Sequence, residues 1–381
     1  MPTSMRKTIS MPVNLLCSNP VRTIALHFAA SLIFALGAMA QSSSEAVLTT
    51  DNAYNPIPSP DGRYIAYVRT GWRREGTIGF GRSSLVSDVK LVNAKGAAPR
   101  TLAKDYFLSG WTPDSTQLVC YRDWKYALVT TEGKQVMEGR IPNDPNKHPA
   151  TEWVAYAPSL ATIVWSRLID SHGVIETPSR TLATEELFAD RVVPSPDGRY
   201  LAIFGQFPQT SLRVYDLRLK SWADLGRISI HPDENWWYIQ PNWNPWFADG
   251  SRLVFLRDST LVITAPDGTQ KTEIKIDGPA GLPVPSPDGQ FLAYVTFEPR
   301  PGQVRPDLQF WGGTTILVVP ISAGSKPLTI TVKHPDEVYD LKWLNNGALV
   351  FDRVADEMFY QHASIWRAAV PSLEQTALPP K

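Results

Sequence analysis

The sequence is poor in cysteine and histidine, and it carries no excess of charge of either sign. It holds two cysteines and six histidines, and its 37 basic residues equal its 37 acidic residues. A chain without a basic excess lacks the electrostatic footprint of nucleic-acid binding, so we expect no nucleic-acid partner. Long helices are also unexpected, because 33 prolines and 24 glycines interrupt most stretches of the chain.

Long apolar runs are rare too, and the one that exists lies near the N-terminus, from Thr23 to Ala40. Three basic residues and no acidic residue precede it, and it ends in A-M-A, a small-x-small motif that signal peptidases accept. These features predict a signal peptide over residues 1–40, cleaved after Ala40, and hence a periplasmic or secreted protein. The alternative is an N-terminal membrane anchor, although His27 and Ser31 interrupt the run.

The predicted mature chain, residues 41–381, has 34 basic and 37 acidic residues, a net charge of −3. Cys17 is lost with the signal peptide, so Cys120 remains alone and no intramolecular disulfide is expected. No second run of about twenty apolar residues exists, and we expect no membrane span after cleavage.

A thirteen-residue pattern recurs along the mature chain and dominates its organisation. The three clearest copies are IPSPDGRYIAYVR at 57–69, VPSPDGRYLAIFG at 193–205 and VPSPDGQFLAYVT at 284–296. Weaker copies are WTPDSTQLVCY at 111–121, YAPSLATIVW at 156–165, WFADGSRLVFL at 246–256 and WLNNGALVFD at 343–352. Repeats spaced by about 40–50 residues are typical of β-propellers.

The S-P-D-G motif within each clear copy has the chemistry of a tight turn. Proline presets φ, aspartate accepts hydrogen bonds from the backbone ahead of it, and glycine adopts a positive φ. Short runs rich in β-branched and aromatic residues follow, as expected for strands. We therefore predict an all-β fold, a seven-bladed propeller of four-stranded antiparallel blades over residues 41–381, with a six-bladed ring as the alternative.

These residues resemble a known repeat family. The S-P-D-G turn followed by an apolar strand is similar to the WD-like propeller repeat of TolB-type proteins, and to the propeller of prolyl oligopeptidase and dipeptidyl peptidase proteins. The resemblance covers about residues 45–375 and implies an architecture rather than an activity. We expect no hydrolase domain, because no G-x-S-x-G nucleophile motif occurs. We also do not expect the N-terminal domain of TolB.

Two segments are candidates for closing the ring. The stretch EAVLTT at 45–50 would supply an outer strand to the last blade, whereas EQTALPP at 374–380 would complete that blade from the C-terminal side. We favour the first arrangement, because overlapping chain ends hold a ring closed.

Motifs that carry catalytic or cofactor chemistry are scarce. There is no H-E-x-x-H, P-loop or C-x-x-C, and we expect no cofactor. The repeated Asp61, Asp197 and Asp288 are interpreted as turn formers. Three histidines precede blades and would form a metal site at the channel if they converged there; they are His148, His231 and His334. This pattern carries the alternative function, a propeller lyase or hydrolase.

Tryptophan is abundant, with 13 residues, and it falls into two groups. Trp111, Trp246 and Trp343 share one position of the repeat, so we predict that they pack between blades. Other aromatic and arginine residues lie in insertions that the repeat does not explain. The predicted binding residues are Trp72, Arg73, Arg74, Trp236, Trp237, Tyr238, Phe310 and Trp311.

The insertions around Trp72 and Trp311 fall between the second and third predicted strands of their blades. That around Trp236 lies between two blades, so all three emerge on one rim of a propeller. Tryptophan and arginine are enriched in interface anchors, which favours binding, although these side chains would otherwise cap neighbouring blades. The sequence thus predicts an exported, non-catalytic propeller that binds an envelope protein or glycan through this rim.

Overall fold

The computed structural model describes a unit within Ser43–Lys381. The described residues are 45–75, 82–122, 124–142, 153–169, 172–185, 189–205, 210–229, 242–281, 283–299, 311–322, 327–332, 337–356 and 361–370. The signal-peptide prediction for residues 1–40 lies outside them. Among the described residues, no helix is long and apolar enough to cross a membrane.

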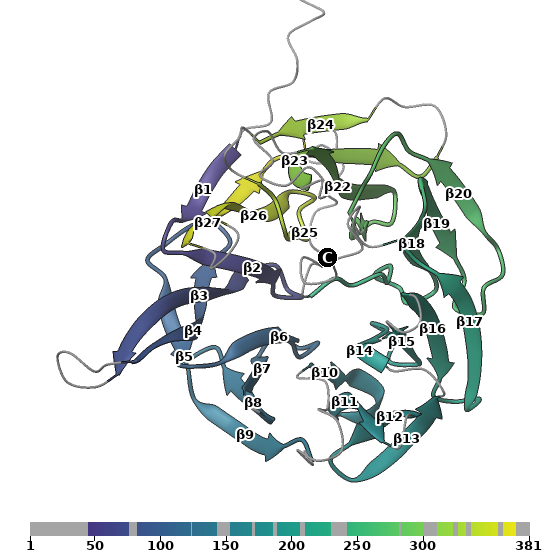
Figure 1. Ribbon diagram of the computed structural model, residues 1–381, viewed down its shortest axis with the longest axis horizontal. Coiled ribbons are helices and arrows are strands. Elements are labelled where there is room, and N and C mark those ends of the chain that lie inside the picture. The colour runs from purple at the N-terminus through teal and green to yellow at the C-terminus, as the bar shows by residue number, and fades with distance from the viewer. Residues whose placement is uncertain are drawn as a thin grey trace, which may run out of the picture. The chain divides into compact units, whose positions relative to one another are not determined.

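Seven antiparallel sheets form the blades of the unit, and they surround one centre (Figure 1). Blade 1 contains β2 (Ala53–Pro58), β3 (Tyr64–Glu75), β4 (Arg82–Asn93) and β5 (Arg100–Ala103). Blade 2 contains β6 (Phe107–Trp111), β7 (Gln117–Arg122), β8 (Lys125–Thr130) and β9 (Gln135–Arg140). Blade 3 contains β10 (Val154–Ala157), the 3-10 turn η1 (Pro158–Leu160), β11 (Thr162–Ile169), β12 (His172–Thr177) and β13 (Arg180–Glu185).

The other four blades complete the ring. Blade 4 contains β14 (Ala189–Pro194), β15 (Tyr200–Gly205), β16 (Ser211–Asp216) and β17 (Ser221–Arg227). Blade 5 contains β18 (Leu253–Arg257), β19 (Thr260–Thr264) and β20 (Thr272–Lys275), with an isolated bridge between Trp246 and Leu253 in place of an inner strand. Blade 6 contains β21 (Val284–Pro285), β22 (Phe291–Pro299), β23 (Trp311–Pro320) and β24 (Leu328–Thr331). Blade 7 contains β25 (Leu341–Trp343), β26 (Leu349–Asp356), β27 (Gln361–Ala368) and β1 (Glu45–Thr49).

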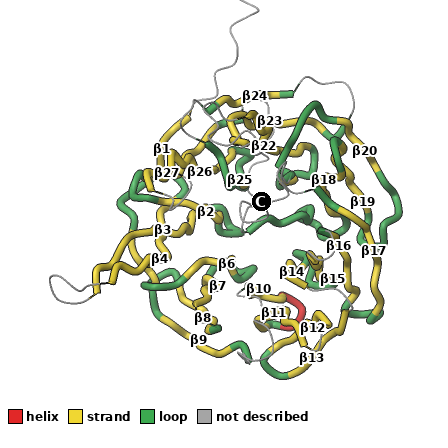
Figure 2. The backbone as a smooth tube through the Cα atoms, in the orientation of Figure 1, coloured by secondary structure: helices red, strands yellow, loops and turns green. Residues whose placement is uncertain are grey.

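The predicted seven-bladed architecture is confirmed, and the six-bladed alternative is wrong. Each copy of the repeat supplies the end of the inner strand, or in blade 5 the isolated bridge, together with the following turn and the second strand of one blade. Strand dominates the described chain, as Figure 2 shows. Buried residues concentrate on the inner three strands, whereas β9 is exposed at five of its six residues.

The N-terminal strand closes the ring, as predicted. β1 pairs antiparallel with β27, from Glu45 opposite Ala368 to Thr49 opposite Ile365. An ion pair between Glu45 and Arg353 of β26 supports this overlap. Blade 7 therefore contains both chain ends of the propeller, and its outer strand comes from the residues directly before blade 1.

The turns after the inner strands have the structure that S-P-D-G predicts. In blade 4, Ser195 Oγ donates to Asp197 Oδ1 at 2.5 Å and accepts from the Tyr200 N–H at 2.9 Å. The same carboxylate oxygen accepts from the Arg199 N–H at 3.1 Å. Gly198 has φ +73°, a conformation that residues with a Cβ rarely adopt. Blades 1 and 6 repeat these bonds, which confirms the turn-forming interpretation of their aspartates.

The tryptophans at the fixed repeat position join neighbouring blades. Trp111, Trp246 and Trp343 each donate their indole N–H at 3.0 Å to a backbone carbonyl of the preceding blade. The acceptors are Ile57, Val193 and Val284, each directly before the first proline of a P-S-P-D-G sequence. Trp246 and Trp343 are buried and Trp111 is half-buried, so the predicted packing role is confirmed.

Candidate functional site

The predicted rim insertions occupy the expected place in their blades. One joins β3 to β4 and the other joins β22 to β23, and both pairs are second and third strands. The β3–β4 pairing continues to Glu75 opposite Arg82, whereas β2 reaches only as far as Arg69. This hairpin projects from the ring in Figure 1. It carries three of the predicted binding residues, Trp72, Arg73 and Arg74, in its distal part.

The binding role of the rim residues stays a prediction. The structure describes the backbone of Trp72, Arg73, Arg74 and Trp311, the last at the start of β23, but not their side chains. The predicted binding residues Trp236, Trp237, Tyr238 and Phe310 lie outside the described residues. The same holds for the three candidate metal ligands, His148, His231 and His334. Among the described residues, no group of three or more His, Cys, Asp or Glu side chains could hold a metal ion.

A pocket at the mouth of the central channel is the site that the described residues build best. All seven blades contribute to its wall through the ends of their inner strands and the following turns. Its volume is about 400 Å³, within the range of about 300–1,000 Å³ typical of small-molecule sites. Prolines of the repeat turns and the partly exposed rings of Trp111, Trp153 and Tyr156 form much of the surface. We call this the channel-mouth pocket.

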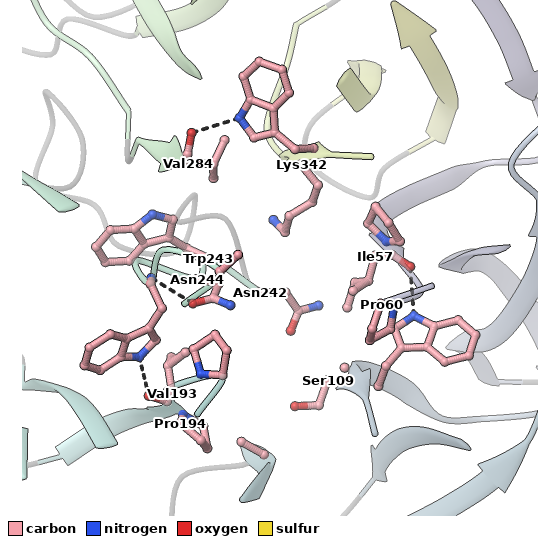
Figure 3. Close-up of a pocket in the computed structure, with 18 of the residues that line it drawn as sticks. Ile57, Pro60, Ser109, Val193, Pro194, Asn242, Trp243, Asn244, Val284 and Lys342 are labelled. Carbon is pink, nitrogen blue, oxygen red and sulfur yellow. Dashed lines mark hydrogen bonds between the residues drawn. The ribbon is translucent and has the colours of Figure 1, made fainter. Parts of the chain in front are cut away.

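Lys342 is the only charged side chain among the described residues that line the channel-mouth pocket. It lies on β25, and Figure 3 shows its side chain extending into the pocket toward Asn242. Its side chain is 11% exposed and its ammonium group pairs with Asp340, which is fully buried. Burial raises the pKa of Asp340, and the positive charge of Lys342 opposes this increase. The Oδ2 atom of Asp340 has no hydrogen-bond partner within the part of the chain that the structure describes.

A second buried carboxylate, Asp352 on β26, lies next to this pair. Its Oδ1 accepts hydrogen bonds from the backbone N–H groups of Tyr339 and Asp340, at 3.0 and 2.8 Å. Its Oδ2 accepts from the Asn55 N–H of blade 1 at 3.3 Å. Burial is the main reason that the pKa of Asp352 rises to about 7, and the charge of Asp340 acts in the same direction. Asp352 thus connects the last blade to the first.

Residues 242–248, which lead into β18 of blade 5, cross the channel (Figures 1 and 2). Asn242 Nδ2 donates to Asn55 Oδ1 of blade 1 at 2.7 Å and to the Leu108 carbonyl of blade 2 at 3.1 Å. The next residue, Trp243, packs against Phe204 of blade 4 and donates its indole N–H to the Pro283 carbonyl at 2.6 Å. This crossing places two amides, Asn242 and Asn244, in the wall of the pocket. It is held by buried partners on blades at opposite sides of the ring.

Arg191 of blade 4 belongs to the same interior polar region. Its guanidinium lies over the Trp153 ring, 4.5 Å from the ring centroid. Its positive charge also acts to lower the pKa of Asp340 of blade 7, so the two groups attract each other. The pocket therefore combines aromatic and proline surfaces with amides and one ammonium group, an arrangement suited to binding a polar ligand of small size.

Sequence reasoning missed this site, although the repeat contains a signal for it. Lys342 lies three residues before Asn345, the position that holds the proline of S-P-D-G in the clear copies. At the place of Lys342 the other six copies carry only uncharged residues. At the position two residues before that of Lys342, four copies carry an apolar residue, and the other three carry Asn55, Arg191 and Asp340. These polar departures are the residues that meet in the channel.

Comparisons with known proteins show the fold alone. No family model matches the chain, and no curated protein matches it by sequence. An oligogalacturonate lyase from Vibrio parahaemolyticus is 12% identical over 87% of this chain and 96% of its own, with a TM-score of 0.59. An oligogalacturonate lyase in complex with manganese is 10% identical over 89% of this chain and 100% of its own, with a TM-score of 0.56. The β-propeller domain of Cps50 (Swd1) from Myceliophteria thermophila is 12% identical over 86% of this chain and 99% of its own, with a TM-score of 0.54.

Proposed function

We propose that this chain is an exported, non-catalytic binding propeller of the cell envelope, and that it binds a glycan in the channel-mouth pocket. The observation that carries the proposal is the wall of that pocket. It places the partly exposed rings of Trp111 and Trp153 beside the amides Asn242 and Asn244 and the ammonium of Lys342.

This combination matches the chemistry of sugars. A pyranose has apolar C–H faces that stack on aromatic rings, and hydroxyl groups that need both donors and acceptors. Indole rings supply the apolar contact, and a carboxamide offers a donor and an acceptor. The Oδ1 atom of Asn242 is buried and has no hydrogen-bond partner among the described residues, so its capacity to accept a hydrogen bond is unused there. The predicted signal peptide over residues 1–40 supports an envelope location.

Gly110 makes a direct test possible. It lines the pocket, and a Cβ added there would meet no heavy atom within 4 Å. The first atom of a side chain therefore has open space at this position, and we expect a large side chain there to occupy part of the pocket. We expect residues 41–381 to capture a subset of glycans on an array, Gly110→Phe to lose that capture, and Gly110→Ala to retain it. Unchanged capture by a folded Gly110→Phe protein would refute the pocket as the glycan site.

The rim remains a second candidate surface, for an envelope protein. Residues 71–75 and 82–86 of the β3–β4 hairpin pair only with each other, and an isolated two-stranded ribbon is marginally stable in water. A bound partner would stabilise it. Pull-down from envelope extract with Trp72→Ala/Arg74→Ala, alongside Trp236→Ala/Trp237→Ala, tests this candidate. Equal recovery of the same partner by both variants and the unchanged chain would remove it.

A further inference from the structure

We propose that the ligand of the channel-mouth pocket carries an anionic group, a carboxylate or a phosphate, which binds to the ammonium group of Lys342. This inference rests on the proposed function, because it specifies the chemistry of a ligand for the same pocket. It begins with the placement of charge: the described wall residues from all seven blades include a single charged side chain, and that side chain is a cation.

The ammonium group has hydrogen-bonding capacity left for a ligand. A lysine has three N–H donors, and Asp340 Oδ1 accepts from one of them. The other two have no partner among the described residues, and the amine end points into the pocket (Figure 3). Asp340 itself is not part of the wall. It holds the lysine from behind, so the side of the ammonium group that faces the pocket is open to an anion.

The surroundings favour an anion over a second cation. Lys342 and Arg191 supply two positive charges in the channel interior, and both act on the carboxyl group of Asp340. Asp340 is the one carboxylate paired with Lys342 among the described residues, and it takes one of the three N–H donors. The remaining donors lie in a largely buried place, where charge-assisted hydrogen bonds to an anion are strong.

The inference is tested with a matched pair of sugars, N-acetylmuramic acid and N-acetylglucosamine, which differ by one carboxylate-bearing substituent. Calorimetric titration of residues 41–381 should show at least a tenfold lower Kd for the acid. Lys342→Met keeps the length of the side chain and removes its charge, and it should abolish this preference. Asp340→Asn removes the counter-charge and should lower the Kd for the acid several-fold, an opposite change that a merely structural role would not produce.

The control is Lys125→Met, which removes a lysine that is 38% exposed on β8 of blade 2 and not part of the pocket wall. Its affinities should equal those of the unchanged chain, and melting curves establish that each variant is folded. Titration with inorganic phosphate separates two sources of the anion. If phosphate displaces the sugar acid, the anion alone suffices for binding; if phosphate does not displace it, the sugar is also required. In either case the proposal stands only if Lys342→Met abolishes the preference for the acid.

Equal affinity for both sugars, or a preference that survives Lys342→Met, would overturn the anionic ligand while leaving the proposed glycan site intact. The absence of any binding that Gly110→Phe removes would overturn the proposed function as well. The two failures are therefore distinguishable by experiment.

Discussion

Replacing Trp246 by phenylalanine should measure how strongly an indole joins two blades. Trp246 is 3% exposed, and its indole N–H donates to the Val193 carbonyl at 3.0 Å. Phenylalanine removes this hydrogen bond but leaves the carbonyl in the strand ladder opposite Ala202, so the loss is about 0.5–1.5 kcal/mol of unfolding free energy. Removing the second ring leaves a small cavity that costs about 1–2 kcal/mol more. We therefore expect a total loss of about 1.5–3.5 kcal/mol.

This loss corresponds to a measurable change in melting temperature. With an unfolding entropy of ~2.1 cal/mol/K per residue, a propeller of roughly 330 residues loses about 1.5 °C per kcal/mol, and the expected decrease is about 2–5 °C. Scanning calorimetry at one fixed scan rate is the assay, because a chain of this size can unfold irreversibly.

Trp366→Phe is the matched control. Its indole N–H donates at 2.8 Å to Ser364 Oγ of its own strand, and its ring is only partly buried. It therefore contributes no hydrogen bond between blades and should lower the melting temperature by less than half as much. Trp111→Phe and Trp343→Phe remove the equivalent bonds at two other junctions and should resemble Trp246→Phe. A decrease for Trp246→Phe no larger than that for Trp366→Phe would refute the reasoning.

Three further predictions concern ionisation, turns and the thiol. The pKa of Asp352 is raised to about 7 from an ordinary value of 3.8, so the folded state binds more protons between these values and its stability falls as pH rises through this window. The free energy of unfolding, measured with urea at pH 5 and pH 7.5, should decrease less or increase more with pH for Asp352→Asn than for the unchanged chain. Identical pH dependence of the two proteins would contradict this assignment. A Cβ on Gly198 would lie 2.6 Å from the Ser159 backbone nitrogen, whereas one on Gly278 would meet nothing within 4 Å, and both residues have positive φ. Gly278→Ala should lower the melting temperature through backbone strain alone, about 1 kcal/mol, and Gly198→Ala should lower it clearly more. Equal decreases would show that the close approach of Gly198 to Ser159 is unimportant. Burial raises the pKa of the Cys120 thiol to about 12, so a thiol reagent at pH 8 should modify it only at the rate of unfolding; rapid modification of the native protein would show that this part of blade 2 opens readily.

The blade architecture follows from local chemistry and was therefore predictable. An S-P-D-G sequence closes its turn with its own serine and aspartate, as Ser195 and Asp197 do, and needs no distant partner. The apolar strand behind it indicates a sheet buried on both faces, and the repetition of the unit indicates a ring. The closing strand at Glu45–Thr49 pairs with a distant strand and was predictable for a different reason, since a blade that lacks its outer strand leaves an edge unpaired.

The channel-mouth pocket was not predictable in the same way, because its residues meet only after the ring closes. Asn55, Asn242 and Lys342 are separated by 100 or more residues, and nothing in the local sequence of any of them requires the other two. Asn55 illustrates the point: it has φ +56° and is 3% exposed, and its backbone and side chain bond to Asp352, Asn242 and the Leu108 carbonyl.

The amino-acid sequence by itself determined the number of sheets, their strands and the turns that begin them, because those features depend on contacts between residues close along the chain. Only the tertiary structure decided which polar departures from the repeat face one another and that the segment before blade 5 crosses the channel. The physical reason is that a ring brings equivalent positions of distant repeats to one centre, where Asn55 bonds to Asn242 and Asp352, residues far from it along the chain.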